Sequence, residues 1–124
     1  MTGLVEAEAA LRAAGFAGVE RDGDVIHARA DGPSAPEFMV ERQGDGLRLT
    51  LRFAVRATDE ERSIWMRAHP QGRLEIAQGE TQLSMALPAG ADLAPALADW
   101  RGLVQSAARA AVEWRRRQKP LYGM

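Results

Sequence analysis

The feature of the sequence that most constrains the fold is the stretch 91–117. Its apolar side chains recur at alternating steps of four and three residues, which places them on one stripe of a single helix. The stripe consists of Leu93, Leu97, Trp100, Val104, Ala107, Ala111 and Trp114. Asp92 is placed to cap the start of this helix, and Pro95 is tolerated within its first turn. The sequence therefore predicts one long C-terminal helix with a single apolar side.

A stripe of this kind can pack on a β-sheet or on a second helix. A coiled coil favours leucine or isoleucine along its seam, whereas the later part of this stripe contains alanines and a tryptophan. We therefore expect the helix to pack on one face of a sheet.

The clearest strands are 37–42 and 47–55, which flank the turn Gly44-Asp45-Gly46. In the second strand apolar and polar residues alternate, as in a strand with one face toward the core and one toward water. Pairing across the turn predicts a register that joins apolar residues on one face and opposite charges on the other. The predicted pairs are Phe38 with Leu51, Val40 with Leu49, Glu37 with Arg52, and Glu41 with Arg48.

The remaining elements follow from shorter signals. Helices are predicted at 2–14 and 58–68, the second from a capping box of Thr58 and Glu61. Further strands are predicted at 24–30, 73–77 and 81–87, with a short arm at 19–21 whose status stays open. The prediction is an α+β fold with an antiparallel sheet of about five strands, in the order α-β-β-β-α-β-β-α, and with the long helix packed on one sheet face.

Composition limits the class of protein. With 124 residues and 13.5 kDa the chain is predicted to form a single domain, with a core at about 4–117 and a tail at 118–124. It has no cysteine, which excludes thiol chemistry and fits a reducing compartment. It has neither a membrane-spanning apolar run nor a signal-peptide pattern, so we expect a cytoplasmic protein. The net charge of -1 provides no overall attraction to nucleic acid or to a membrane.

No motif points to catalysis or to a bound cofactor. His27 and His69 have no carboxylate or second histidine at metal-ligand spacing, so both are expected to be structural. No serine lies in a G-x-S-x-G motif, and the turn at Gly44 joins two strands, whereas a nucleotide-binding loop opens a helix. We therefore expect a protein that is not an enzyme and that has no metal ion and no cofactor.

Two groups of side chains are candidate contact sites. Trp65 and Met66, with Arg62 on the same helix, are candidates for a partner or dimer interface, because the large side chains of this helix cannot all face one sheet. The alternative, that Trp65 is a core residue at the edge of the domain, stays open. The second group, a candidate contact for an anion, consists of Arg115, Arg116 and Arg117.

The order and length of the elements resemble the class I type III secretion chaperones and the related YbjN-like proteins of bacteria. The resemblance extends from Leu4 to Trp114 and rests on element order, without a residue motif. It implies a cytoplasmic homodimer that binds an extended segment of a protein partner in hydrophobic surface grooves, with no enzymatic activity and no cofactor. The near-neutral charge fits the YbjN-like branch at least as well as the chaperone branch, whose members tend to be acidic.

Three functions compete at this point. The main hypothesis is a non-enzymatic homodimer that binds a polypeptide, along an exposed sheet edge or on the apolar surface near Trp65 and Met66. The alternative is a small-molecule-binding protein or enzyme with an apolar pocket between the sheet and the C-terminal helix. The third is binding of nucleic acid by the C-terminal arginines, which predicts an affinity that falls steeply with salt and is lost on truncation after Trp114. It is not favoured, because the net charge of -1 gives no overall attraction to nucleic acid.

Overall fold

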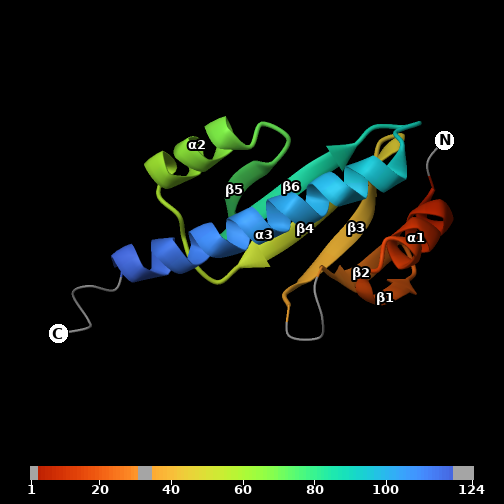
Figure 1. Cartoon of the computed structure of the whole chain (residues 1–124), viewed down its shortest axis with the longest axis horizontal. Helices are drawn as coiled ribbons and strands as arrows, with labels where there is room; N and C mark the ends of the chain where they lie inside the picture. Colours follow the sequence, from red (N-terminus) through yellow and green to blue (C-terminus); the bar gives the residue numbers. More distant parts are fainter. Residues whose placement is uncertain (1–2, 31–34, 119–124) are drawn as a thin grey trace.

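The computed structural model describes residues 3–30 and 35–118 (Figure 1). Its helices are α1 (Leu4–Ala13), α2 (Asp59–Ala68) and α3 (Leu93–Gln118). Its strands are β1 (Ala17–Asp22), β2 (Val25–Arg29), β3 (Glu37–Gln43), β4 (Gly46–Phe53), β5 (Arg73–Ala77) and β6 (Glu80–Leu87). Neighbouring strands are antiparallel, and their order in the sheet is β1-β2-β3-β4-β6-β5. These observations confirm an α+β fold with an antiparallel sheet and a long C-terminal helix.

The described sheet has six strands, one more than the sequence predicted, and the order of elements is α-β-β-β-β-α-β-β-α. The additional strand is β1, which pairs with β2. Its register shifts between Ala17 and Glu20, and Gly18 within the shift has a φ of 60°, a left-handed value that favours glycine. This bulge interrupts the period-two alternation, and most side chains of β1 are exposed. The strand therefore lacks the pattern that reveals the others.

The register of β3 and β4 is as predicted for the pairs that the structure aligns. These pairs include Phe38 with Leu51, Val40 with Leu49, and Glu41 with Arg48. The charged side chains, however, lean toward other strands, because long side chains on one sheet face can reach diagonal neighbours. Glu37 contacts His27 and Arg29 of β2. Arg48 reaches across β6 to Glu75 of β5, so the register was predictable and the ion pairs were not.

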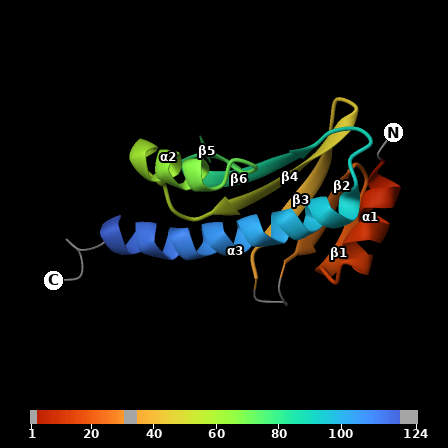
Figure 2. The ribbon, with the colours of Figure 1, turned by 45° about the horizontal axis from the view of Figure 1, so that its top comes forward.

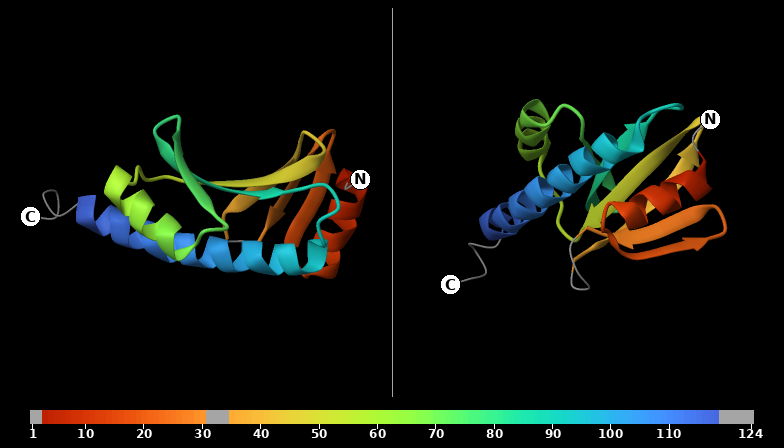
Figure 3. Two further views of the ribbon diagram at one scale, coloured as in Figure 1. Left: turned by 90° about the horizontal axis from the view of Figure 1, so that it is seen from above. Right: turned by 45° about the vertical axis from the view of Figure 1, so that its right-hand side comes forward.

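The helices lie on one side of the sheet, and no helix of the described ranges covers the opposite, open face (Figure 3). α3 runs over β4 and β6, while α1 lies over β1, β2 and β3. α2 packs beside β5 and along the C-terminal half of α3 (Figure 2). Contacts with other molecules are therefore available on the open face and around α2.

The predicted apolar stripe of α3 forms the centre of the core. Six of its seven residues are at most 4 % exposed, and the seventh, Leu93, is half-buried. Trp100 meets Phe38 of β3 edge to face at 5.5 Å, and Phe38 meets Phe16 in the same manner at 5.5 Å. The layer between the sheet and α3 is thus filled with packed apolar side chains.

Candidate functional site

Trp65 lies between α2 and α3 and is 6 % exposed. Its Nε1 donates a hydrogen bond to Ser106 Oγ of α3 at 3.3 Å. Gly72, which leads into β5, lies so close to the indole ring that an added Cβ would be 2.8 Å from it. Trp65 therefore belongs to the packing of its own chain, and only a small part of its surface is open to a partner.

Trp65, His69 and Ser106 form a closed hydrogen-bonded group. His69 Nδ1 lies 2.9 Å from the backbone oxygen of Trp65, and His69 Nε2 lies 2.8 Å from Ser106 Oγ. A carbonyl oxygen can only accept, so in the neutral ring Nδ1 carries the hydrogen and Nε2 accepts the hydroxyl hydrogen of Ser106. The two rings are also stacked, with centroids 4.3 Å apart. His69 thus links α2 to α3 through Ser106, which fits the structural role predicted for it.

A serine bonded to a histidine is also the starting arrangement for nucleophilic catalysis. Ser106, however, lies in the interior of α3, where the backbone N–H groups are used by the helix and cannot stabilise an oxyanion. The Trp65 N–H is directed at Ser106 Oγ itself. This geometry favours a structural role for the group.

Met66 and Arg62 have different surroundings from Trp65. Met66 is directed to β5, where its Sδ accepts a hydrogen bond from the N–H of Leu74 at 3.3 Å. Arg62 pairs with Asp59 of the same helix, while its Nε is buried without a partner among the described residues. The structure therefore does not gather the three candidate interface residues into one exposed patch.

The C-terminal arginines are partly engaged with carboxylates. Arg116 pairs with Glu113 at 3.2 Å, and Arg117 pairs with Glu61 of α2 at 3.3 Å. Arg115 is half-buried. An anion bound at this cluster would compete with both glutamates. The pair of Arg117 and Glu61 also joins the end of α3 to α2.

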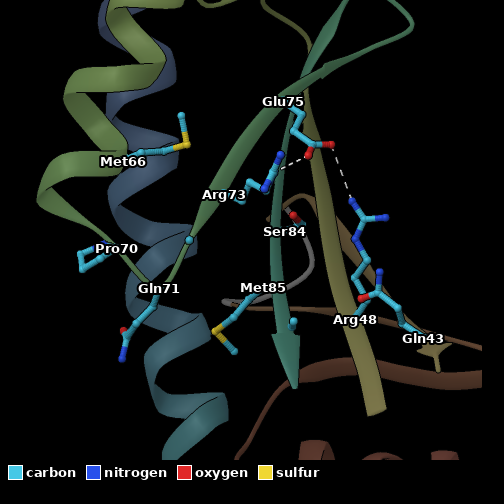
Figure 4. Close-up of a pocket in the computed structure, with 11 residues that line it drawn as sticks. Gln43, Arg48, Met66, Pro70, Gln71, Arg73, Glu75, Ser84 and Met85 are labelled. Carbon is cyan, nitrogen blue, oxygen red and sulfur yellow. Dashed lines mark hydrogen bonds and ion pairs between the residues drawn. The ribbon is translucent and has the colours of Figure 1, made fainter. Parts of the chain in front are cut away.

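The structure brings together a second group of polar side chains, which the sequence did not single out. They line one side of a hollow of about 700 Å³ at the edge of β6, where β5 begins, and this hollow is lined from both faces of the sheet (Figure 4). Its polar lining includes Arg48 of β4, Arg73 and Glu75 of β5, and Ser84 of β6; Met66, Pro70 and Met85 contribute apolar surface. Glu75 contacts both arginines, and its Oε2 lies 3.9 Å from Arg48 Nη2.

Ser84 lies at the bottom of this hollow. It is 5 % exposed, and its hydroxyl has no hydrogen-bond partner within the described part of the chain. On the open face it lies between Thr50 of β4 and Arg73 of β5. The sequence does contain a signal for this site, since positions 84 and 86 place the small residues serine and alanine on the polar face of a strand. These small residues leave space between Arg48 and Arg73 on the neighbouring strands, and that space forms the polar side of the hollow.

β6 continues beyond the start of its neighbour β5. Ala77 pairs with Glu80 across a two-residue turn, so the even-numbered residues of β6 direct their N–H and C=O groups toward β5. The last pair joins Arg73 to Ser84, and no residue of β5 lies opposite Ala86. The backbone of Ala86, an exposed residue that lines the hollow, therefore has no partner on this side among the described residues.

The chain that precedes β5 leaves the sheet toward α3. Gln71 Nε2 donates to Asp99 Oδ2 of α3 at 3.3 Å. An added Cβ on Gly72 would lie 3.2 Å from Leu103 of α3. The chain before β5 therefore does not fill the position in the sheet beside Ala86, and this position opens onto the hollow.

Residues 3–30 and 35–118 contain no group of three or more His, Cys, Asp or Glu side chains that could hold a metal ion. Within the same ranges no helix has the length and hydropathy needed to cross a membrane. Comparison with protein-family models, with curated proteins and with solved structures found no match to this chain. The resemblance to the secretion chaperones and YbjN-like proteins thus stays a prediction.

Proposed function

We propose that this chain is a non-enzymatic module that binds an extended polypeptide segment, which adds to the sheet beside Ala86. The observation that carries the proposal is the backbone edge of β6, which is free where β5 begins and faces a hollow of about 700 Å³. Extended peptides bind to such edges by main-chain hydrogen bonds, while adjacent pockets select side chains.

On each outer edge of the sheet, one backbone group is already bonded to a side chain of a helix. On β5, the outward N–H of Leu74 is bonded to Met66 Sδ. On β1, the carbonyl oxygen of Val19 accepts a hydrogen bond from Arg12 of α1 at 3.1 Å. Covering an edge with a neighbouring helix is a common protection against unwanted strand pairing. The edge at Ala86 has no such cover among the described residues.

The free edge is short, which limits what main-chain pairing can contribute. Ala86 offers one donor and one acceptor, whereas Pro88 has no N–H and its carbonyl accepts from Ala91 at 3.1 Å. Backbone pairing would therefore set the register of the segment, and side chains would supply most of the affinity. Met66 and Met85 suit this role, because methionine adapts its shape to varied apolar groups.

The proposal is tested by panning a phage-displayed library of random octapeptides on the wild-type chain and on Ala86→Pro. Proline removes only the N–H that faces the free edge, since the odd-numbered residues of β6 pair with β4. Ala86→Val keeps the N–H and serves as the matched control. We expect peptides that bind wild type and Ala86→Val, with affinity for Ala86→Pro reduced about tenfold, the loss of roughly one hydrogen bond.

Because Ala86→Pro could also disturb folding, a second measurement uses the wild-type chain. Hydrogen exchange of the Ala86 amide should slow when a selected peptide is added, since the N–H becomes hydrogen bonded. Peptides whose binding ignores Ala86→Pro and leaves this amide unprotected would contradict strand addition at this edge.

The predicted homodimer is part of the proposal and is tested separately by light scattering over a dilution series. A dimer would have twice the chain mass of 13.5 kDa. A monomer at every concentration would contradict the proposed dimer, whereas the proposed peptide site would be unaffected and is judged by the peptide experiments alone. The small-molecule alternative would gain support if a metabolite raised the melting temperature without displacing a selected peptide.

A further inference from the structure

The side of the hollow that lies on the open face has a charge arrangement that goes beyond a general peptide site. Arg48 and Arg73 stand on either side of β6, and the side chains between them on that strand are the small Ser84 and Ala86. A single carboxylate, that of Glu75, contacts both arginines. The hollow thus has an excess of positive charge and an unpartnered hydroxyl at its floor.

Sheet geometry defines where a side chain of the bound segment would point. Residues directly opposite one another in adjacent strands share a face, so the residue paired with Ala86 would direct its side chain to the open-face side of the hollow. It would lie about 10 Å across the sheet from Arg48, with only the methyl group of Ala86 between them, and roughly 7 Å along the strand from Arg73. The long side chains of Arg48 and Arg73 can contact this side chain, one from across the sheet and the other from along the strand.

The hydroxyl of Ser84 is a further polar group that a ligand in the hollow can reach. The residue is 5 % exposed and lines the hollow, and its hydroxyl is not among the described side-chain atoms that are fully buried without a partner, so it is open to the hollow. An oxygen that reaches the floor of the hollow would accept its hydrogen. When no peptide is bound, the carboxylate of Glu75 is the anion that contacts both guanidinium groups.

We infer that the hollow selects an aspartate or glutamate at the position of the segment that pairs with Ala86, and that Arg48, Arg73 and Ser84 hold its carboxylate. This inference rests on the proposed strand addition, and it names the chemical class of the partner as an acidic extended segment. Glu75 acts as an internal competitor that the incoming carboxylate displaces. Planar guanidinium groups suit this exchange because they bind carboxylates in defined geometry.

The test uses a synthetic peptide from the octapeptide selection, prepared with Glu, Gln or Lys at the position that pairs with Ala86. Binding is measured by fluorescence anisotropy to wild type, Arg48→Gln, Arg73→Gln and Arg52→Gln. Arg52 is the matched control, because it lies on the same face of β4 and its Nη1 donates to Gln78 at 2.9 Å, away from the hollow. We expect Glu to bind about three- to fivefold more tightly than Gln on wild type and on Arg52→Gln.

On Arg48→Gln or Arg73→Gln the difference between the Glu and Gln peptides should shrink toward zero. Glu75→Gln should act in the opposite direction and tighten binding of the Glu peptide, because it removes the competing carboxylate. Peptides that depend on Ala86 but show no preference for an acid would overturn this inference and leave the proposed function intact. If the binding of no peptide is weakened by Ala86→Pro, both the acid preference and the proposed strand addition are contradicted.

Discussion

At the scale of single residues, Trp65 combines several contacts in one side chain. It packs against Gly72, donates to Ser106 and stacks on His69. The sequence left two roles open for this residue, an interface anchor or a core residue at the domain edge. The structure buries it in its own chain, and a substitution separates the two roles by experiment.

Trp65→Ala should lower the free energy of unfolding by about 3–5 kcal/mol, the usual cost of emptying a large buried aromatic site. Urea denaturation measures this change. Ile64→Ala is the neighbouring control, because Ile64 is 53 % exposed and the change should stay within about 0.5 kcal/mol. Weakened self-association or peptide binding by Trp65→Ala at unchanged stability would show that Trp65 is an interface residue after all.

At the scale of elements, α2 is joined to α3 by side chains and to the sheet through the entry into β5. Glycine at position 72 permits the close approach of that entry to Trp65 and Leu103, since an added Cβ would meet them at 2.8 Å and 3.2 Å. This position also directs the chain toward α3 and leaves the edge of β6 free beside Ala86. The packing of α2 and the candidate binding edge therefore depend on the same short stretch.

Two substitutions of glycine by alanine should have opposite effects on stability. Gly72→Ala should lower the free energy of unfolding by about 1–3 kcal/mol, because the added methyl overpacks the contact with Trp65. Gly102→Ala in α3 meets no atom within 4 Å and should raise it by about 0.5–1 kcal/mol through helix propensity. Thermal unfolding of both variants against wild type gives the signs, and a Gly72→Ala variant that is as stable as wild type or more stable would contradict the packing described for Gly72.

At the scale of the whole molecule, one sheet face is packed and the other is open. β4 lies between β3 and β6 and beneath α3, whereas β1 lies at the edge of the sheet with mostly exposed side chains. Local opening should therefore be rare in the middle of the sheet and frequent at this edge. The open face stays accessible without any movement of the helices.

Native-state hydrogen exchange should show this gradient. We expect the slowest strand amides in β4, which is hydrogen bonded on both sides, and the fastest in β1. Mass spectrometry of peptic fragments resolves the two segments, and β3 is the internal reference between them. Equal exchange in β1 and β4 would indicate that the sheet opens as one unit.

Much of the fold was predictable because it is recorded in short-range patterns. The stripe of α3, the capping box at Thr58 and Glu61, and the pairing of Phe38 with Leu51 all depend on residues close in sequence or joined by a tight turn. Their hydrophobic periodicity repeats often enough to exceed chance. β1 was underestimated because its bulge at Gly18 breaks that periodicity over a strand of six residues.

The candidate site was not predictable in the same way. Arg48, Arg73 and Ser84 come from three strands, and their meeting depends on the order β4-β6-β5, in which β6 lies between its two partners. The free edge at Ala86 exists because β6 extends past the first residue of β5. The start of β5 is set by the chain at Gly72, which lies against α3. Trp65 and Ser106 are 41 residues apart and meet because α2 packs on α3. Patterns along the chain record which face of an element is apolar, whereas these contacts arise from how separate elements are placed, and no local repeat carries that information.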